Sequence, residues 1–422
     1  MSREDRLEDS PMRNSSVGYK PTVLFRKTYR ATEFKMKKED YAKDFGPFED
    51  SIWLNCAHQG ALPRVAAEAA EEAIAWKRAP WNLTTERFGS VPQRLKQALG
   101  KLIHVPAEEI VLGNSNSYGL HLLANGMRWQ AGDEVLLARG DFPSTILPWL
   151  GLRERGVAVR LIEPGDGSLS VEDVARNITP ATKLLCTTWV HSFTGRAVDA
   201  QSIGELCRAR GVTFALNVSQ ALGVRRFSPS AFPVDAITSV GFKWLCGPYG
   251  AGFCWMRSEL LESLAYNQAY WLSAQTADDL AREPGIPSLP AGLGARRYDV
   301  FATANFFNFM PWTASVEYLL RQGIENVEDY SQRLVSRLID GLDLEKYDLL
   351  SPRSGATRST LVFISHKQPS RNHEIYEMLR KERVFVAHRA GKLRFSPHLY
   401  NTFQEIDLAL SLLNSYGGAP GQ

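Results

Sequence analysis

The sequence predicts an α/β protein with two lobes, a larger one with a mostly parallel sheet between helices and a smaller one of α+β type. Three observations predict it. Apolar runs of strand length alternate regularly with helical stretches up to about residue 255, which is typical of βαβ units and parallel sheets. The length of 422 residues exceeds what one ordinary core holds. After residue 255 the pattern loosens, which indicates a separate lobe.

After the extension we expect a short strand over 52–54, followed by Pro63 and two amphipathic helices, RVAAEAAEEAIAWKRA and VPQRLKQALGKLI. The strands predicted after them are EIVLG, DEVLLA, VAVRLIEP, TKLLCTTWV, VTFALNV and a run ending near Val240. The helices between these strands are SNSYGLHLLANGM, 144–155, a stretch from Val171, and 200–210. Parallel sheets of this kind bind ligands at the carboxyl ends of their strands, so we expect the site there.

The smaller lobe follows a stretch over 267–299 that is rich in Gly and Pro and predicts an irregular loop. Its predicted elements are helices at 306–322, 327–342 and 373–381, the strand regions TLVFISH and VFVAHRAGKLRFSP, and a terminal helix from Thr402. We expect four segments: a polar extension over 1–48, a segment over 49–90 that contributes to the small lobe, a large domain over 91–300 and a small domain over 301–422.

Composition excludes several classes of protein. The net charge is only +3, so no nucleic-acid partner is expected. No apolar run approaches the length of a membrane span, and the N-terminus lacks an apolar core, so we expect neither insertion nor export. The cysteines lack the spacing of a zinc site or a disulfide framework, which favours a reducing cytoplasm and no metal. They are Cys56, Cys186, Cys207, Cys246 and Cys254.

One lysine stands out at a strand end, in the stretch AITSVGFKWLCGPYGAGFCW. Lys243 lies between an apolar run and the glycine-rich turn 247–252, where small residues leave space above the amine. A lysine partly removed from water loses its proton near neutral pH and attacks aldehydes, which is how a Schiff-base lysine works. The alternative is a strand-end lysine that points at solvent.

Four other strand ends carry polar or aromatic residues, and each has a simpler explanation. The run 113–117 predicts a phosphate site at a helix start, or only an N-cap. The run 141–144 places Phe142 at a strand end, where a core role is the alternative. Thr194-Gly195 and the run 217–220 supply polar groups that ordinary turn chemistry also explains.

In this order, these segments resemble the class V aminotransferase family of pyridoxal-phosphate enzymes, of fold type I, which includes cysteine desulfurases, kynureninase and isopenicillin-N-epimerase-like proteins. The resemblance covers about residues 50–415. The matching stretches are GDEVLLARGDFPSTILPWLGL, VTFALNVSQALG, SVGFKWLCGPYGAGF and GKLRFSPHLYNTFQEID. It implies a large lobe with a mostly parallel, seven-stranded type of sheet, and pyridoxal 5'-phosphate as the cofactor.

The resemblance also implies roles for residues around the cofactor. Lys243 would hold it as an aldimine, and Phe142 would lie on its ring. Asn116 and Ser117 would bind its phosphate at the helix start, and Gln220 would hydrogen-bond its phenolic oxygen.

Substrate-side residues are implied in the same way. Arg394 would hold the α-carboxylate through a bidentate pair. Asn55 and His58 match the family's substrate-side loop. Thr303 matches a hydroxyl that reaches the phosphate of a neighbouring subunit, which implies a homodimer with shared sites.

Several positions depart from the family pattern. The aspartate that pairs with the pyridine nitrogen is Asn217 here, and a neutral amide makes the ring a weaker electron sink. A usual histidine and a usual serine are replaced by Phe242 and Val240, and Ser239 is a candidate to supply the lost hydroxyl. The loop before Arg394 holds no cysteine, which disfavours sulfur transfer.

The sequence therefore predicts an enzyme that labilises a bond at the α-carbon of an amino acid. Elimination or C–S lysis, epimerisation and decarboxylation with deamination stay open, and transamination is disfavoured by Asn217. A class V aminotransferase proper and a catalytically inactive binding protein are the alternatives. Aromatic residues at 270–271 and arginines at 296–297, if they line the site, suggest a polar or acidic substrate.

Overall fold

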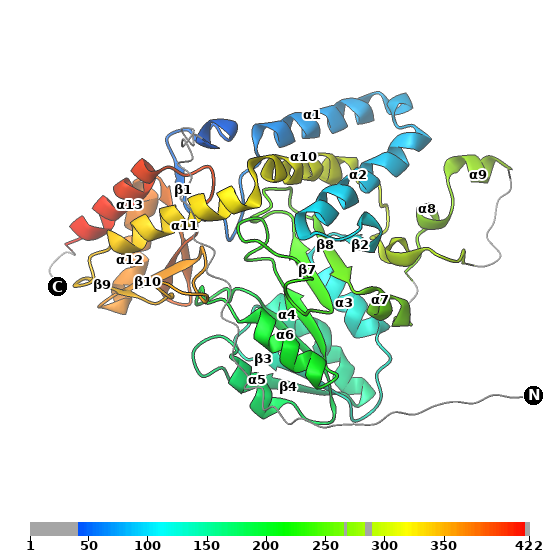
Figure 1. Ribbon diagram of the computed structural model, residues 1–422. Coiled ribbons are helices and arrows are strands. Elements are labelled where there is room, and N and C mark those ends of the chain that lie inside the picture. Colours follow the sequence, from blue (N-terminus) through cyan, green and yellow to red (C-terminus); the bar gives the residue numbers. More distant parts are fainter. Residues whose placement is uncertain (1–40, 266–267, 283–288, 418–422) are drawn as a thin grey trace, which may run out of the picture. The chain divides into compact units, whose positions relative to one another are not determined.

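A seven-stranded sheet forms the core of the large lobe in the computed structural model, which describes residues 41–265, 268–282 and 289–417. Figure 1 shows its arrangement. The strand order is β2-β8-β7-β6-β5-β3-β4, and only β8 runs antiparallel to its neighbours. The strands are β2 (Ile110–Gly113), β3 (Glu134–Ala138), β4 (Ala158–Ile162), β5 (Thr182–Thr188), β6 (Thr213–Asn217), β7 (Ala236–Val240) and β8 (Gly252–Met256). The predicted mostly parallel sheet is confirmed.

Helices cover both faces of this sheet, as its burial pattern requires. Successive residues of β3, from Val135 to Leu137, are all fully buried, although their side chains point to opposite faces. The helices of this region are α3 (Asn116–Gly126), α4 (Pro143–Leu150), α5 (Val171–Asn177), α6 (Ala200–Ala209) and α7 (Ser258–Ser263). The helix predicted over 144–155 ends at Leu150 and continues as the 3-10 helix η4 (Gly151–Arg155).

The first helices pack beside a helix from much later in the chain. The helices α1 (Arg64–Arg78) and α2 (Thr85–Ile103) both contact α10 (Phe306–Gln322) (Figure 1). The stretch predicted as an irregular loop contains three short helices within its described residues, α8 (Trp271–Ala274), α9 (Ala277–Arg282) and η5 (Gly294–Tyr298). The remaining 3-10 helices are η1 (Tyr41–Asp44), η2 (Pro80–Asn82), η3 (Ala107–Glu109) and η6 (Pro369–Arg371).

The C-terminal region is an α+β unit around a four-stranded antiparallel sheet of order β12-β13-β10-β9. Its strands are β9 (Tyr347–Leu349), β10 (Val362–His366), β12 (Ala387–Arg389) and β13 (Lys392–Phe395), and its helices are α11 (Ile324–Asp340), α12 (Asn372–Lys381) and α13 (Phe403–Ser415). A parallel pair joins β1 (Ile52–Trp53) to β11 (Val384–Phe385). The N-terminal segment thus pairs with the C-terminal region, although the four-segment division itself stays a prediction.

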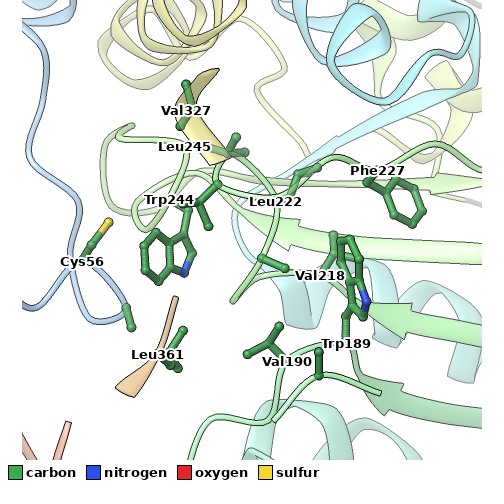
Figure 2. Close-up of a cluster of buried hydrophobic side chains, with 14 of the residues drawn as sticks. Cys56, Trp189, Val190, Val218, Leu222, Phe227, Trp244, Leu245, Val327 and Leu361 are labelled. Atoms are coloured by element: carbon green, nitrogen blue, oxygen red, sulfur yellow. The ribbon is translucent and has the colours of Figure 1, made fainter. Parts of the chain in front are cut away.

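A buried cluster anchors the chain directly after Lys243. Trp244 and Leu245 are completely buried, and Figure 2 draws them with Val218 and Leu222 from the turn after β6. The predicted extension over 1–48 lies mostly outside the described residues. Within the described part of the chain, no helix combines the length and the hydropathy that crossing a membrane requires.

Candidate active site

A cavity of about 540 Å³ opens where β2, β3, β5, β6 and β7 end, at the carboxyl edge of the large sheet. Parallel α/β sheets bind ligands at this edge, at the point where the strand order reverses. Eight of the predicted site residues line it: His58, Asn116, Ser117, Phe142, Asn217, Gln220, Lys243 and Arg394. The fold therefore brings together residues that are more than 300 positions apart in the sequence.

Lys243 enters this cavity from a tightly held backbone. Its carbonyl oxygen accepts a hydrogen bond of 3.0 Å from the Cys246 amide. A Cβ at Gly60 would lie 2.0 Å from the same oxygen, so only glycine fits there. The Lys243 Nζ lies 5.5 Å from the centroid of the Phe142 ring, which faces the cavity from the end of β3.

The environment of Lys243 favours the neutral amine. Burial first, and then the positive charges of Arg394 and Arg389, together lower the pKa of Lys243 to about 7. Among the described residues that line the cavity there is no aspartate or glutamate to stabilise an ammonium. A large share of this lysine is therefore nucleophilic at neutral pH.

The start of α3 offers an anion site on the opposite wall. Ser115 caps the helix by accepting a hydrogen bond of 3.3 Å from the Tyr118 amide, and Ser115, Asn116 and Ser117 all line the cavity. Amides in the first turn of a helix lack intrahelical partners and attract phosphate. The Asn116 side chain is already engaged, because its Nδ2 donates to Ser144 Oγ at 3.2 Å and its Oδ1 accepts from Thr238.

Asn217 and Gln220 are held by hydrogen bonds on the next wall. Asn217 Oδ1 accepts from the Ser219 amide at 3.0 Å, and its Nδ2 donates to Thr145 Oγ1 at 3.0 Å. Gln220 Oε1 accepts from Trp244 Nε1 at 3.2 Å, and its Nε2 donates to the carbonyl oxygen of Ala57 at 3.3 Å. Each amide nitrogen retains one further hydrogen, so both side chains remain able to donate into the cavity.

Arg394 on β13 is a buried cation with an unused donor. It is only 4% exposed, and its Nε has no hydrogen-bond partner among the described residues. Its Nη2 donates to Asn55 Oδ1 at 3.2 Å. Burial, followed by the charge of Arg389, lowers the pKa of Arg394 to about 10. A buried guanidinium with a free donor is suited to a carboxylate ligand.

The sequence model named Aminotransferase class-V matches residues 82–408, which is more than half of the chain. The chain belongs to the class-V aminotransferase family. It is therefore a pyridoxal-phosphate-dependent enzyme of fold type I, as the resemblance predicted.

Individual relatives of this class-V chain are distant. A probable cysteine desulfurase of Methanothermobacter thermautotrophicus is 24% identical, covering 91% of this chain and 99% of its own length. The isopenicillin N epimerase of Streptomyces clavuligerus is 25% identical, covering 86% and 94% respectively. A C-DES mutant structure with glycine covalently linked to the PLP cofactor has a TM-score of 0.80 at 21% identity, covering 89% of this chain and 99% of that one.

Another solved structure is a complex of the cystine C-S lyase C-DES with its reaction product, cysteine persulfide. Its TM-score is 0.78 at 22% identity, and the match covers 87% of this chain and 98% of that one. At these identities the structural likeness establishes the fold.

The cavity of this class-V chain fits the cofactor on structural grounds. Ser219 Oγ is buried on the cavity wall and has no hydrogen-bond partner in the part of the chain that the structure describes. The start of α3 lies against Gly252. A Cβ at Gly252 would lie 2.6 Å from the Ser115 carbonyl carbon, so the helix start approaches β8 as closely as glycine permits. An anion site, a partly neutral lysine and the Phe142 ring therefore surround one space.

Three predicted residues lie outside this cavity. Asn55 instead contacts Arg394. Ser239 is buried, with its Oγ 3.5 Å from the Val240 carbonyl oxygen, so it is not placed to replace a lost hydroxyl on the cavity wall. Thr303 Oγ1 donates to the carbonyl oxygen of Val300 at 3.2 Å and lines a separate cavity of about 350 Å³.

Arg296 lines the same separate cavity as Thr303, and neither Arg297 nor the Tyr270-Trp271 pair lines the Lys243 cavity. Sequence reasoning assigned no role to several residues that do line it: Ser144, Ser192, Ser219, Phe242, Tyr249 and Arg389. Ser219 lies inside the 217–220 run, so its position in the sequence could have indicated a place in the site. Arg389 carried no local signal, because its place depends on strand register.

Proposed function

We propose that this enzyme is a lyase that eliminates a leaving group from the β-carbon of an amino acid. The observation that carries this proposal is one cavity in which Lys243, the buried Arg394 and the start of α3 face the same space. These groups supply a proton carrier, a carboxylate site and a phosphate site. Bound pyridoxal phosphate supplies an electron-withdrawing ring that weakens bonds to the substrate α-carbon.

Lys243 has the properties of the proton carrier. Its neutral amine takes the proton from the α-carbon, and the same nitrogen, now protonated, donates to the departing group. The α-carbon–hydrogen bond and the bond from the β-carbon to the leaving group break, and the electron pair of the first forms the new double bond. Arg394 orients the substrate by its α-carboxylate through its unused Nε and the adjacent Nη.

Asn217 favours elimination over transamination. Its amide is neutral and is held by Thr145 and Ser219, so the cofactor ring gains no charge-assisted bond at this position. A ring that withdraws electrons weakly stabilises the electron pair at the α-carbon poorly. It therefore suits a reaction in which the leaving group departs as soon as the α-proton has been removed. Elimination meets this condition, whereas transamination requires reprotonation of the cofactor.

The cavity also disfavours sulfur transfer to an enzyme thiol. Among the described residues that line it there is no cysteine. Cys56 and Cys246 lie nearby but are completely buried, and the Cys56 thiol together with burial raises the pKa of Cys246 well above its usual value. A lyase releases its product directly and requires no such thiol.

The remaining roles follow the family pattern. We place Phe142 on the cofactor ring, Ser117 and the Asn116 amide at its phosphate, and Gln220 at its phenolic oxygen. His58 lies on the substrate side, at the cavity mouth. The enzyme acts as a cytoplasmic homodimer in which Thr303 serves the cofactor of the partner, which is consistent with its position outside the cavity of its own chain.

Two experiments test this proposal. Borohydride treatment of the purified holoenzyme, followed by peptide mapping, is expected to label Lys243, and Lys243→Ala is expected to lose the label while keeping its circular dichroism. Label on another lysine overturns the assignment. Incubation with β-chloroalanine is then expected to release pyruvate, ammonia and chloride in equal amounts.

Other products identify the alternatives. Dependence on an added keto acid identifies an aminotransferase, and inversion at the α-carbon without release of ammonia identifies an epimerase. If candidate amino acids shift the cofactor spectrum but none is consumed, the chain is a binding protein.

A further inference from the structure

The charges on the cavity wall are all of one sign. Its ionisable side chains with basic groups are His58, Lys243, Arg389 and Arg394, and the described lining residues include no carboxylate. The proposed function uses Lys243 for proton transfer and Arg394 for the α-carboxylate. Arg389 is left without a role, although it adds a permanent positive charge.

A short hairpin holds Arg389 beside Arg394. The two residues lie on the paired antiparallel strands β12 and β13, where Ala387 stands opposite Arg394 and Arg389 opposite Lys392. Opposite residues of such a ladder share a face, so Arg389 and Arg394 project from the same side of the sheet. The turn between the strands is the tight pair Ala390-Gly391, with φ of 48° and 75°, which is the conformation of a two-residue hairpin.

The guanidinium of Arg389 is free within the described part of the chain, where no hydrogen bond or ion pair engages it. Its charge nevertheless acts on the site. After burial, Arg389 is the next cause that lowers the pKa of both His58 and Arg394. The side chain is exposed at the cavity mouth, so a ligand can reach it without any rearrangement.

We propose that Arg389 binds a carboxylate at the far end of the substrate side chain, so that the enzyme selects amino acids whose β-substituent is anionic. This inference rests on the proposed function, because it assigns the α-carboxylate to Arg394. A second carboxylate at Arg389 accepts two parallel hydrogen bonds from the guanidinium. It also neutralises the charge of Arg389, whereas a neutral substituent leaves that guanidinium without an ionic partner.

Binding of simple carboxylates to the holoenzyme tests this inference without turnover. Titration calorimetry compares succinate, glutarate and adipate with propionate, butyrate and pentanoate, which lack the second carboxylate. At the length that spans the two arginines, we expect the dicarboxylate to bind more tightly, but by no more than about fivefold, because Arg389 is exposed and its charge is screened by solvent. Arg389→Gln is expected to remove this preference without weakening the monocarboxylate, whereas Arg394→Gln weakens both.

Lys392→Gln is the matched control. Lys392 stands opposite Arg389 in the ladder but does not line the cavity, so this variant removes an equal charge from the same hairpin. The preference for dicarboxylates is expected to survive in it. The inference is overturned if the native enzyme shows no such preference at any length, or if Lys392→Gln loses as much of it as Arg389→Gln.

The outcome is separable from that of the proposed function. If borohydride labels Lys243 and pyruvate is released, but dicarboxylates bind no more tightly than monocarboxylates, only the role of Arg389 fails. If Lys243 is not labelled, the proposed function fails, whatever the carboxylates do. The melting temperature of each variant verifies that the fold persists.

Discussion

At the residue scale, the reactivity of Lys243 comes from what surrounds its amine and not from any single partner. Burial removes water, and Arg394 and Arg389 add repulsion toward a proton, which together lower its pKa to about 7. The Phe142 ring lies beside the amine, with 5.5 Å between the ring centroid and Lys243 Nζ. The lysine is prepared to attack an aldehyde before any ligand arrives.

The pH dependence of cofactor binding to the apoprotein follows from this pKa. The neutral amine is the reactive form, and a lowered pKa means that it predominates above about pH 7. The rate of cofactor attachment is expected to rise with pH, reach half its maximum near pH 7 and then level off. Stopped-flow absorbance measures it, with a free lysine derivative as the control for the ionisation of the cofactor. A rate that continues to rise up to about pH 10, as for an unperturbed lysine, contradicts the expectation.

Asn217→Asp tests the electronic role of the amide. The site accommodates the change, because the Thr145 hydroxyl is able to donate to a carboxylate and the Ser219 amide already donates. A charge-assisted bond to the ring strengthens electron withdrawal by about 1.5–3 kcal/mol. The ratio of transamination to elimination is expected to rise about tenfold or more, as measured by product analysis. An unchanged ratio and unchanged pH profile show that the argument from Asn217 is wrong.

At the element scale, the anion site depends on how closely the start of α3 approaches β8. Gly252 pairs with Gly113 of β2, and its Cα faces the backbone of Ser115. Two adjacent strands therefore carry glycine where the helix begins. This contact sets the position of the first-turn amides relative to the cavity.

Gly252→Ala is expected to displace those amides. The added Cβ would lie within 2.7 Å of three Ser115 backbone atoms, so the helix start must move. Such overpacking costs about 1–3 kcal/mol. We expect a larger dissociation constant for the cofactor and a lower melting temperature, measured by equilibrium titration and calorimetry. Gly165→Ala is the control, because a Cβ at Gly165 would meet nothing within 4 Å, and it should change neither quantity.

At the scale of the whole molecule, the cavity is assembled by pairing between distant parts of the chain. Strand β1 pairs with β11, and Asn55 near its end contacts Arg394 on β13. Asn401 Nδ2 also donates to the Trp53 carbonyl oxygen at 3.2 Å. These contacts hold the N-terminal loop with His58 against the strands that carry the arginines.

The proposed homodimer makes a prediction about mixed subunits. Lys243→Ala and Thr303→Val chains are each expected to show reduced activity alone, the first because it lacks the lysine and the second because it lacks the hydroxyl given to its partner. Unfolding and refolding the two together is expected to recover activity, because one site of each hybrid is complete. Sedimentation measures the dimer. No recovery in hybrids whose formation is verified indicates that Thr303 acts within its own chain or not at all.

Much of this site was accessible from the sequence because each strand end carries its own local pattern. The alternation of strands and helices placed Lys243, Asn217, Gln220 and Phe142 at the same sheet edge, and the structure brings all four to one cavity. Ser239 was harder to place because side chains alternate along a strand, so neighbouring residues face opposite ways. The role suggested for it required knowing which face of β7 turns toward the cavity.

The sequence by itself predicted the mostly parallel sheet, because hydrophobic period is a property of neighbouring residues. Its resemblance to the class V aminotransferases predicted the family and the role proposed for Lys243. Tertiary structure alone decided that Arg389 lines the same cavity as Arg394 and His58, and that Thr303 and Arg296 line another cavity. Distances between residues far apart in the chain depend on strand register and packing, which no local pattern encodes. In the proposed function, the reaction uses residues that local patterns predict, whereas the proposed selection of substrate by Arg389 uses these long-range contacts.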